Sequence, residues 1–323
     1  MNRLTRRHQA KKIVRHYFDE QGFLEVDSPV LIRANAVEAF IDPIWVQDEQ
    51  LRTSPELYLK RLLARGYDKI YELGHVFRDE SEGQLHLREF TLLEWYRTHA
   101  SLMDLVADCE ELFRRLAPEK FHRPFEVVSL QELWQKHVGI DLRRSIEEAN
   151  LPQKVTEKGF ALRPEADFSD AFHQVMWAQI EPQIGQETPC VVTRWPRSMA
   201  ALSAYCADDP CFAERFEIYY QQVELANAFL ELTDPQEQRR RFQEEQQIRE
   251  SLGKRSPELD HEFLEELASM PVTAGIAVGF DRLLMVACDA KSVSDVTELL
   301  KTNSRANGCF GMGDCENDGC NLD

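Results

Sequence analysis

Hydrophobic and polar positions alternate with a period of two along residues 90–96, the end of the stretch IYELGHVFRDESEGQLHLREFTLLEWY at 70–96. A β-rich run at 70–78 precedes it, and the polar loop between the two runs predicts a β-hairpin. The alternation places Phe90, Leu92, Glu94 and Tyr96 on one face of the second strand. Thr91, Leu93 and Trp95 fall on the other face. A carboxylate and a phenol are costly to bury without partners, so the first face is expected to line a site. A hairpin with one face in solvent is the alternative.

Other segments show the spacing of helices. Residues 3–21 form an amphipathic pattern in which apolar positions stand among basic ones, and Gly22 supplies the stop. Residues 51–66 place Thr53 or Ser54 as the cap of a helix, and Glu56 lies in its first turn. A strand-like run at 23–32 lies between these two segments. Further helices are expected at 101–122, within 123–190 and over the strongly charged stretch 234–269, which we interpret as a solvated surface.

Two of the strands expected after residue 190 carry acids. Runs at 190–196, 215–220 and 222–232 predict antiparallel strands with a turn near Gln221. Glu217 and Glu224 lie near opposite sides of that turn, where two carboxylates facing one point suit Mg²⁺. An edge hairpin with its acids in solvent is the alternative. Strict alternation would place Asn227, Phe229 and Glu231 on the face opposite Glu224. If all of these residues line one pocket, the strand must bulge or end near 226–227.

A strand of small residues at 273–279 leads into a helix. The sequence TAGIAVGFDRLLM places Asp281 at the start of this helix and Arg282 in its first turn. A cation beside the positive end of a helix favours a bound anion, and the preceding glycines allow close approach of the backbone. The segment therefore predicts an anion site at Arg282.

Composition restricts the class of protein. With 323 residues, 43% of them hydrophobic and 29% charged, the chain is an ordinary globular one with ample core. The net charge of −18 disfavours a nucleic-acid partner, whose phosphates need basic residues. No apolar run has the length of a membrane span or a signal peptide, so we expect a cytoplasmic protein with no membrane association. The eight scattered cysteines indicate reduced thiols. The tail at 303–323, rich in Gly, Asn, Asp and Cys, is predicted to be disordered.

Three of these segments resemble, in order, the motifs of one enzyme family. FRDE followed by EFTLLEWY resembles motif 2 of the class II aminoacyl-tRNA synthetases in its lysine-type version. The first helix, its glycine and the strand that ends near Pro29 resemble motif 1, and GIAVGFDRLLM resembles motif 3. The chain is most similar to the elongation factor P lysine ligases, paralogues of lysyl-tRNA synthetase in which the catalytic domain stands alone. The resemblance implies an α+β fold, with an antiparallel sheet flanked by helices, and a homodimer formed through motif 1. It implies a catalytic domain at 1–302, and we expect 123–190 to be an insertion that packs over the site.

The resemblance also implies a role for each site residue. Arg78 and Arg282 would be catalytic, because they clamp the phosphates of ATP. The nucleotide site would comprise Arg78, Asp79, Glu80, His86, Glu224, Leu225, Gly279 and Arg282. Glu217 and Glu224 would hold Mg²⁺, and Glu56 would receive the α-ammonium group of the substrate. The amino-acid site would comprise Ser54, Pro55, Glu56, Glu94, Tyr96, Asn227, Phe229, Glu231 and Ala277.

The amino-acid site predicts a substrate. Acids clustered with aromatic side chains, with no Arg or Lys among them, would select an amino acid with two positive nitrogens. The resemblance implies an ATP-dependent ligase that activates (R)-β-lysine or lysine as an adenylate and transfers it to a lysine side chain of elongation factor P rather than to tRNA. One alternative is a stand-alone lysyl-tRNA synthetase-like enzyme that acylates tRNA or another amine with α-lysine. Another is a catalytically inactive binding module.

The chain departs from the family pattern at four positions. Ala277 replaces the Gly of lysyl synthetases, as is typical of the ligases, and its methyl group is expected to narrow the pocket in favour of (R)-β-lysine. Ala228 replaces a usual Gly. Leu87 and Arg88 replace an Asn and a Pro of motif 2, so the contact of that Asn with ATP is not carried over.

Overall fold

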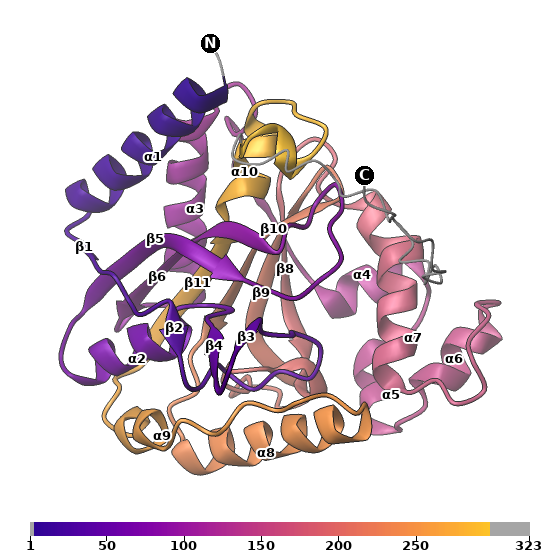
Figure 1. Cartoon of the computed structure of the whole chain (residues 1–323). Coiled ribbons are helices and arrows are strands. Elements are labelled where there is room, and N and C mark those ends of the chain that lie inside the picture. Colours follow the sequence, from indigo (N-terminus) through magenta and orange to yellow (C-terminus); the bar gives the residue numbers. More distant parts are fainter. Residues whose placement is uncertain (1–2, 298–323) are drawn as a thin grey trace, which may run out of the picture.

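The computed structural model describes residues 3–297, and an eight-stranded sheet runs through this part of the chain in the order β1-β5-β6-β11-β10-β9-β8-β7 (Figure 1). The strands are β1 (Leu24–Glu25), β5 (Lys69–Phe77), β6 (Glu89–Thr98), β11 (Thr273–Gly279), β10 (Val223–Leu230), β9 (Phe212–Tyr220), β8 (Cys190–Pro196) and β7 (Glu126–Ser129). Neighbours from β5 to β8 pair antiparallel, whereas the edge strands β1 and β7 pair in parallel. The expected α+β fold with an antiparallel sheet is confirmed.

One face of the sheet is covered by helices α1 (Arg3–Glu20), α3 (Leu102–Leu116) and α10 (Phe280–Ala287). The alternation in β6 sends Leu93 and Trp95 into the core beneath these helices, where both are fully buried. Phe216 and Ile218 of β9 join the same cluster. This is the face predicted for Leu93 and Trp95, and burial of their large apolar side chains fixes the register of the hairpin.

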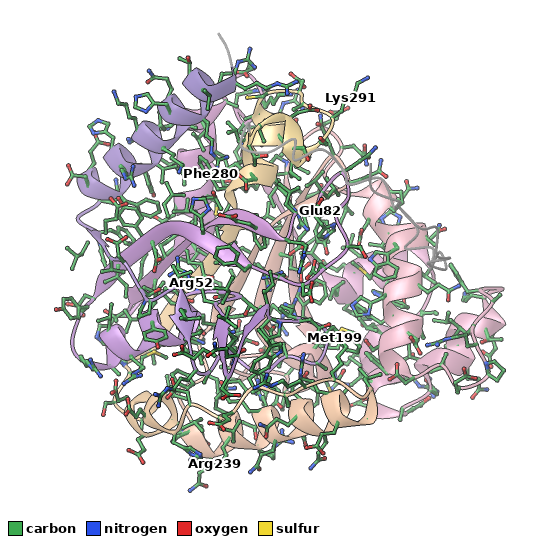
Figure 2. The ribbon with its side chains drawn as sticks, viewed as in Figure 1. Arg52, Glu82, Met199, Arg239, Phe280 and Lys291 are labelled. Carbon is green, nitrogen blue, oxygen red and sulfur yellow. The ribbon has the colours of Figure 1, made fainter. Side chains whose placement is uncertain are left out.

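The opposite face is covered at one end by α2 (Glu56–Ala64), α8 (Pro235–Ser251) and α9 (His261–Leu267). Their core contains Leu59, Phe242 and Phe263, and it reaches the sheet at Tyr96. A small sheet of β2 (Leu31–Ile32), β4 (Glu49–Leu51) and β3 (Trp45–Val46) lies beside it. In Figure 2, Arg239 projects outward from α8.

Residues 123–190 extend the main sheet at its edge. They form β7, α4 (Leu130–His137), α5 (Leu142–Glu147), α6 (Leu151–Glu157), α7 (Phe168–Val175), a π-helical turn (Met176–Ile180) and a 3-10 turn (Glu181–Gln183). Trp134 of α4 stacks on Phe172 of α7 in a second core, separate from that of the central helices. The segment shares one core with β8 and β9.

The structure corrects several expected boundaries. The run at 23–32 forms two-residue strands instead of one long strand, because Pro29 has no N–H to donate and Ser28 donates to the Glu72 side chain. The helix expected over 234–269 is two helices, since α8 ends just before Gly253, whose φ is +68°. Its surface is not wholly solvated either. Arg249 is 1% exposed and donates to the carbonyl oxygens of Glu38 and Ile41 at 2.9 Å.

No helix in residues 3–297 is long and apolar enough to cross a membrane. The five cysteines within the described range are free thiols: Cys109, Cys190, Cys206, Cys211 and Cys288. The tail predicted at 303–323 lies outside the described residues.

Candidate active site

The open face of the sheet presents its polar side chains in rows that cross the strands. One row runs through residues paired in register on five neighbouring strands: Glu72, Glu94, Ala277, Asn227 and Glu217. The next row on the same face contains Tyr96, Gly275, Phe229 and Arg215. Because side chains two residues apart share a face, these rows bring segments far apart in sequence to one surface.

A bulge in β10 brings Glu224 to this surface. Glu224 pairs with Tyr219 and Ala226 pairs with Ile218, so Leu225 is the extra residue. The inserted residue reverses the alternation, and Glu224 then lies on the face of Asn227 and Phe229. The bulge that one common pocket required is confirmed, at Leu225, one residue before the predicted 226–227.

These side chains surround a cavity of about 380 Å³, here called the inner cavity. Its lining includes every predicted site residue except Pro55 and Asp79: Ser54, Glu56, Arg78, Glu80, His86, Glu94, Tyr96, Glu217, Glu224, Leu225, Asn227, Phe229, Glu231, Ala277, Gly279 and Arg282. Pro55 is the N-cap of α2, whereas Ser54 accepts from the backbone N–H of Glu56. Asp79 is exposed and pairs with Arg88 at 2.7 Å on the outer side of the loop.

Three carboxylates and one ammonium group form one end of the inner cavity. Lys60 Nζ lies 2.6 Å from Glu56 Oε1 and 2.5 Å from Glu231 Oε2. The third acid, Glu94, accepts hydrogen bonds from Ser54 Oγ at 2.7 Å and from the Tyr96 hydroxyl at 3.0 Å. The expectation of acids with no Arg or Lys among them is therefore wrong. One turn of helix separates Lys60 from Glu56 in α2, and the tertiary fold then brings Glu231 to the same ammonium group.

Burial changes the protonation of the acids at this end of the cavity. Burial, reinforced by repulsion from Glu56, raises the pKa of Glu94 to about 8. Burial also raises the pKa of Glu231, although Lys60 opposes the rise. Glu231 is 4% exposed, and neither of its carboxylate oxygens has a hydrogen bond of good geometry in the described structure. Buried acceptors of this kind fit a cationic ligand that donates hydrogen bonds.

Gly275 makes room for this arrangement. A Cβ atom at position 275 would overlap the Glu231 carboxylate and the Tyr96 ring. The neighbouring row has Ala277 between Glu94 and Asn227, so a methyl group projects there instead. Gly275 and Ala277, two residues apart on β11, thus shape the floor of the acidic end.

Two arginines lie at the other end of the inner cavity. Arg78 follows β5, and its guanidinium group lies 5.3 Å from the centre of the Phe90 ring. Its buried Nε has no hydrogen-bond partner in the described structure. Arg282, in the first turn of α10, donates to the Leu85 carbonyl at 3.2 Å and the Glu224 carbonyl at 3.0 Å. A planar cation with a free donor, close to a second arginine, suits phosphate oxygens.

The first turn of α10 is tied to the start of β6. Asp281 is 3% exposed and accepts from the Thr91 N–H at 2.8 Å, and it forms an ion pair with Arg7 of α1. These contacts hold the helix end at which Arg282 sits. Arg282 Nη2 also lies 2.9 Å from His86 Nε2, and burial together with Arg282 lowers the pKa of His86. A neutral His86 thus accepts from Arg282 and anchors the motif 2 loop.

Glu217 and Glu224 meet beside the arginines. Glu217 accepts from the Tyr219 hydroxyl and from Arg215, each at 2.5 Å, while Glu224 forms an ion pair with Arg282 at 3.3 Å. Burial raises the pKa of Glu217 to about 7, with repulsion from Glu224 adding to the rise and Arg215 opposing it. Two carboxylates that repel each other at the phosphate end offer the oxygen ligands that Mg²⁺ takes.

Sequence reasoning missed three residues of the site. Lys60 neutralises part of the acidic end, and its spacing of four from Glu56 was the available signal. Arg215 shares a strand face with Glu217, and its guanidinium lies 4.4 Å from the Trp195 ring and 5.6 Å from the Phe229 ring. Glu38, on the loop between β2 and β3, also lines the cavity. No sequence pattern marks Glu38.

A larger cavity of about 880 Å³, here called the outer cavity, opens beside the inner one. It lies between the sheet and α7, and Figure 2 shows Met199 in this region. Leu85, His86 and Arg282 border both cavities. The site therefore has two compartments in contact at its phosphate end.

Comparison with known proteins gives a consistent result. The family model for tRNA synthetases class II (D, K and N) matches residues 1–303. A protein of Histophilus somni (strain 2336) named elongation factor P--(R)-beta-lysine ligase is 40% identical over 295 residues, which cover 88% of this chain and 90% of that protein. A protein of the same name from Haemophilus ducreyi is 38% identical over 305 residues, covering 91% of this chain and 92% of that protein. The chain thus belongs to the class II tRNA synthetases of the aspartate, lysine and asparagine group.

Proposed function

We propose that the protein is an ATP-dependent ligase that activates (R)-β-lysine or lysine as an aminoacyl-adenylate and transfers it to a lysine side chain of elongation factor P. One observation carries the proposal. A single cavity has the carboxylates of Glu56, Glu94 and Glu231 at one end, where Lys60 pairs with Glu56 and Glu231, and Arg78 with Arg282 at the other. The first end suits the two ammonium groups of the amino acid, and the second suits the phosphates of ATP. The names of the similar proteins agree.

The acidic end would orient the amino acid. Glu56 takes the ammonium group nearer the substrate carboxylate, while Glu94 and Glu231 take the distal amine, with Ser54, Tyr96, Asn227 and Phe229 around them. Glu231 Oε1, which has no partner in the described structure, gains a donor when the amine binds. Binding at this end directs the carboxylate toward Arg78.

Activation proceeds at the arginine end. An oxygen of the amino-acid carboxylate attacks the α-phosphorus of ATP, the bond to the β-phosphate oxygen breaks, and pyrophosphate leaves. Arg78 and Arg282 stabilise the charge that develops on the phosphates, and Glu80, Leu225 and Gly279 line the nucleotide site. Mg²⁺, held by Glu217 and Glu224, would supply further charge neutralisation at the phosphates. Asp79 does not line the cavity and pairs with Arg88, so we assign it no contact with ATP.

Ala277 supports (R)-β-lysine over α-lysine. Its methyl group stands between Glu94 and Asn227 on the neighbouring strands, at the floor of the acidic end. An added methyl group there shortens the space beside the amine, which fits an amino group placed one carbon further along. The substitution Ala277→Gly is expected to raise the ATP–pyrophosphate exchange activity with α-lysine relative to that with (R)-β-lysine.

We also propose a homodimer that acts in the cytoplasm, where a translation factor would be its acceptor. The segment after α1 carries exposed apolar side chains, with Leu24 50%, Leu31 45% and Val46 41% exposed. Exposed apolar side chains that recur within one segment favour an interface. Light scattering coupled to gel filtration would measure the mass, and a monomer at micromolar concentration would contradict the dimer.

The experiment that tests the function is ATP–pyrophosphate exchange with α-lysine and (R)-β-lysine side by side, followed by intact-mass measurement of elongation factor P. We expect exchange with (R)-β-lysine and a mass increase of one residue on the acceptor. Exchange followed by acylation of tRNA with α-lysine would favour a stand-alone lysyl-tRNA synthetase-like enzyme instead. A flat exchange signal with every basic amino acid would contradict the enzyme proposal altogether.

A further inference from the structure

Glu38 stands where the two cavities meet. Its side chain lines both the inner and the outer cavity. Within residues 3–297 its carboxylate forms no hydrogen bond and no ion pair, although most other acids of the site have a partner. The activation step described above gives this carboxylate no role.

The backbone around Glu38 is fixed. Arg249 Nη1 donates to the Glu38 carbonyl at 2.9 Å, and the Ala39 N–H donates to Glu245 Oε2 at 2.6 Å. Val37 and Ala39 are each 1% exposed. With both neighbours buried and the carbonyl held by α8, the Glu38 side chain is directed into the cavity.

Charged groups on four elements surround the Glu38 carboxylate. Glu56 of α2 and Glu245 of α8 repel its anion, while Arg78 after β5 and Arg215 of β9 attract it. Burial is the largest influence, and together with Glu56 it raises the pKa of Glu38 to about 7. Glu38 therefore lies near both Glu56, which would hold the ammonium beside the reacting carboxyl group, and Arg78, which would hold the α-phosphate.

The outer cavity suits the approach of a lysine side chain. Its lining includes the acids Glu181, Glu244 and Glu245, which attract an ammonium group. Two large apolar side chains on it are open to solvent, since Phe40 is 71% and Trp177 66% exposed. An acceptor amine that enters the outer cavity would reach the adenylate past Glu38, which lines both cavities.

Resting on the function proposed above, we propose that Glu38 is the general base of the transfer step. The acceptor ε-amine has an ordinary pKa of about 10.4, so at neutral pH it arrives as an ammonium ion that cannot attack. The Glu38 carboxylate removes one proton. The amine nitrogen then forms a bond to the carbonyl carbon of the adenylate, the bond from that carbon to the phosphate oxygen breaks, and AMP leaves with the electron pair. The nitrogen releases its second proton to solvent as the amide forms, and Glu38 returns its proton to solvent through the outer cavity. His86 is not available for this role, since its Nε2 already faces Arg282.

The test separates the two steps with the variant Glu38→Gln. Activation transfers no proton from the acceptor, so ATP–pyrophosphate exchange with (R)-β-lysine should stay within about threefold of the wild type. Single-turnover transfer from preformed adenylate to elongation factor P should fall about 100- to 1,000-fold, the usual loss on removing a general base. The wild-type transfer rate should rise with pH and level off above about 7, and the variant should lose this inflection.

Three controls distinguish a base from a structural residue. Glu187→Gln removes an exposed acid that pairs with Arg123 at 3.4 Å and lines neither cavity, so it should leave both steps unchanged. Glu38→Asp should restore part of the transfer rate. Hydroxylamine, a nucleophile that is already neutral at pH 7, should react with the adenylate equally fast in the wild type and in Glu38→Gln.

Two outcomes would overturn the role of Glu38. Equal losses in exchange and transfer would make it a residue that positions the substrate, and wild-type transfer by Glu38→Gln would place the base elsewhere. Neither outcome touches the proposed function, because that fails only if the wild-type protein shows no exchange or no transfer.

Discussion

Lys60 decides the charge of the acidic end at the scale of single residues. Its ammonium group contacts Glu56 and Glu231, and it is fully buried. Burial alone would lower the pKa of Lys60, but the two carboxylates raise it, so the lysine stays charged. One cation against Glu56 and Glu231 compensates buried charge, while Glu94 stays available to a ligand.

Replacing Lys60 by Met should destabilise the protein by about 3 kcal/mol, because buried carboxylates lose their cation. The loss should grow between pH 6 and pH 9, since a carboxyl group whose folded pKa is raised loses stability as it ionises. Urea unfolding at several pH values measures this. Lys154→Met, which removes an exposed partner of Glu157, should cost less than about 0.5 kcal/mol. Equal effects of the two substitutions would contradict the buried role.

Glu94 should control recognition of the distal amine. Glu94→Gln removes one of the two acids proposed for that amine, so the KM for the amino acid should rise about 100-fold. The KM for ATP should change little, because Arg78 and Arg282 lie at the other end of the cavity. Pyrophosphate exchange with each substrate varied in turn measures both constants, and an equal rise in the two would contradict the assignment.

At the scale of elements, β11 shapes the floor of the site. Thr273–Gly279 lies between β6 and β10, and its Gly275 leaves space for the Glu231 carboxylate and the Tyr96 ring. The bulge in β10 acts on the adjacent strand, since Leu225 turns Glu224 to the face of Asn227. The glycine in β11 and the bulge in β10 both change side-chain positions, but neither changes the order of strands in the sheet.

Gly275→Ala should therefore lower the free energy of unfolding by about 1–3 kcal/mol, because the new methyl group overlaps side chains that cannot both move away. Exchange activity should fall as well, since Glu231 is displaced. Gly83→Ala serves as the control: no atom lies within 4 Å of its Cβ position, and its effect should be below about 0.5 kcal/mol. If the denaturant concentration at the unfolding midpoint is the same for Gly275→Ala and the wild type, the strand accommodates the methyl group and the prediction is wrong.

At the scale of the whole molecule, the cavity couples substrate binding to protons. The pKa of Glu94 is about 8 without ligand, so at pH 7 this group is mostly protonated. A bound ammonium favours the carboxylate, and binding then expels the proton. The affinity for the diamino acid should rise about tenfold per pH unit from pH 6 to pH 8 and level off above. Calorimetry in two buffers of different ionisation enthalpy measures the released proton, and identical heats would contradict the coupling.

The sequence predicted the parts of the site that local patterns define. Period-two alternation assigned Glu94 and Tyr96 to one face of β6, and Leu93 and Trp95 to the core. The order of three motifs predicted the antiparallel sheet and placed Arg78 and Arg282 in one cavity. Alternation, together with the expectation that these residues line one pocket, also required β10 to bulge or end near 226–227.

Local sequence patterns could not predict contacts between segments that are far apart in the chain. The pairing of Lys60 with Glu231 depends on how α2 docks on the end of β10, and the loop with Glu38 is held by α8 through Arg249. The strand predicted at 23–32 failed because Ser28 and its neighbours bond to side chains and single carbonyl groups rather than to one long partner strand.

By itself the sequence determined which residues face the site along each strand, because pleating and motif spacing act over a few residues. Only the tertiary structure decided how charge is balanced there, because Coulomb interactions in a buried cavity depend on which distant side chains come within a few ångströms of each other.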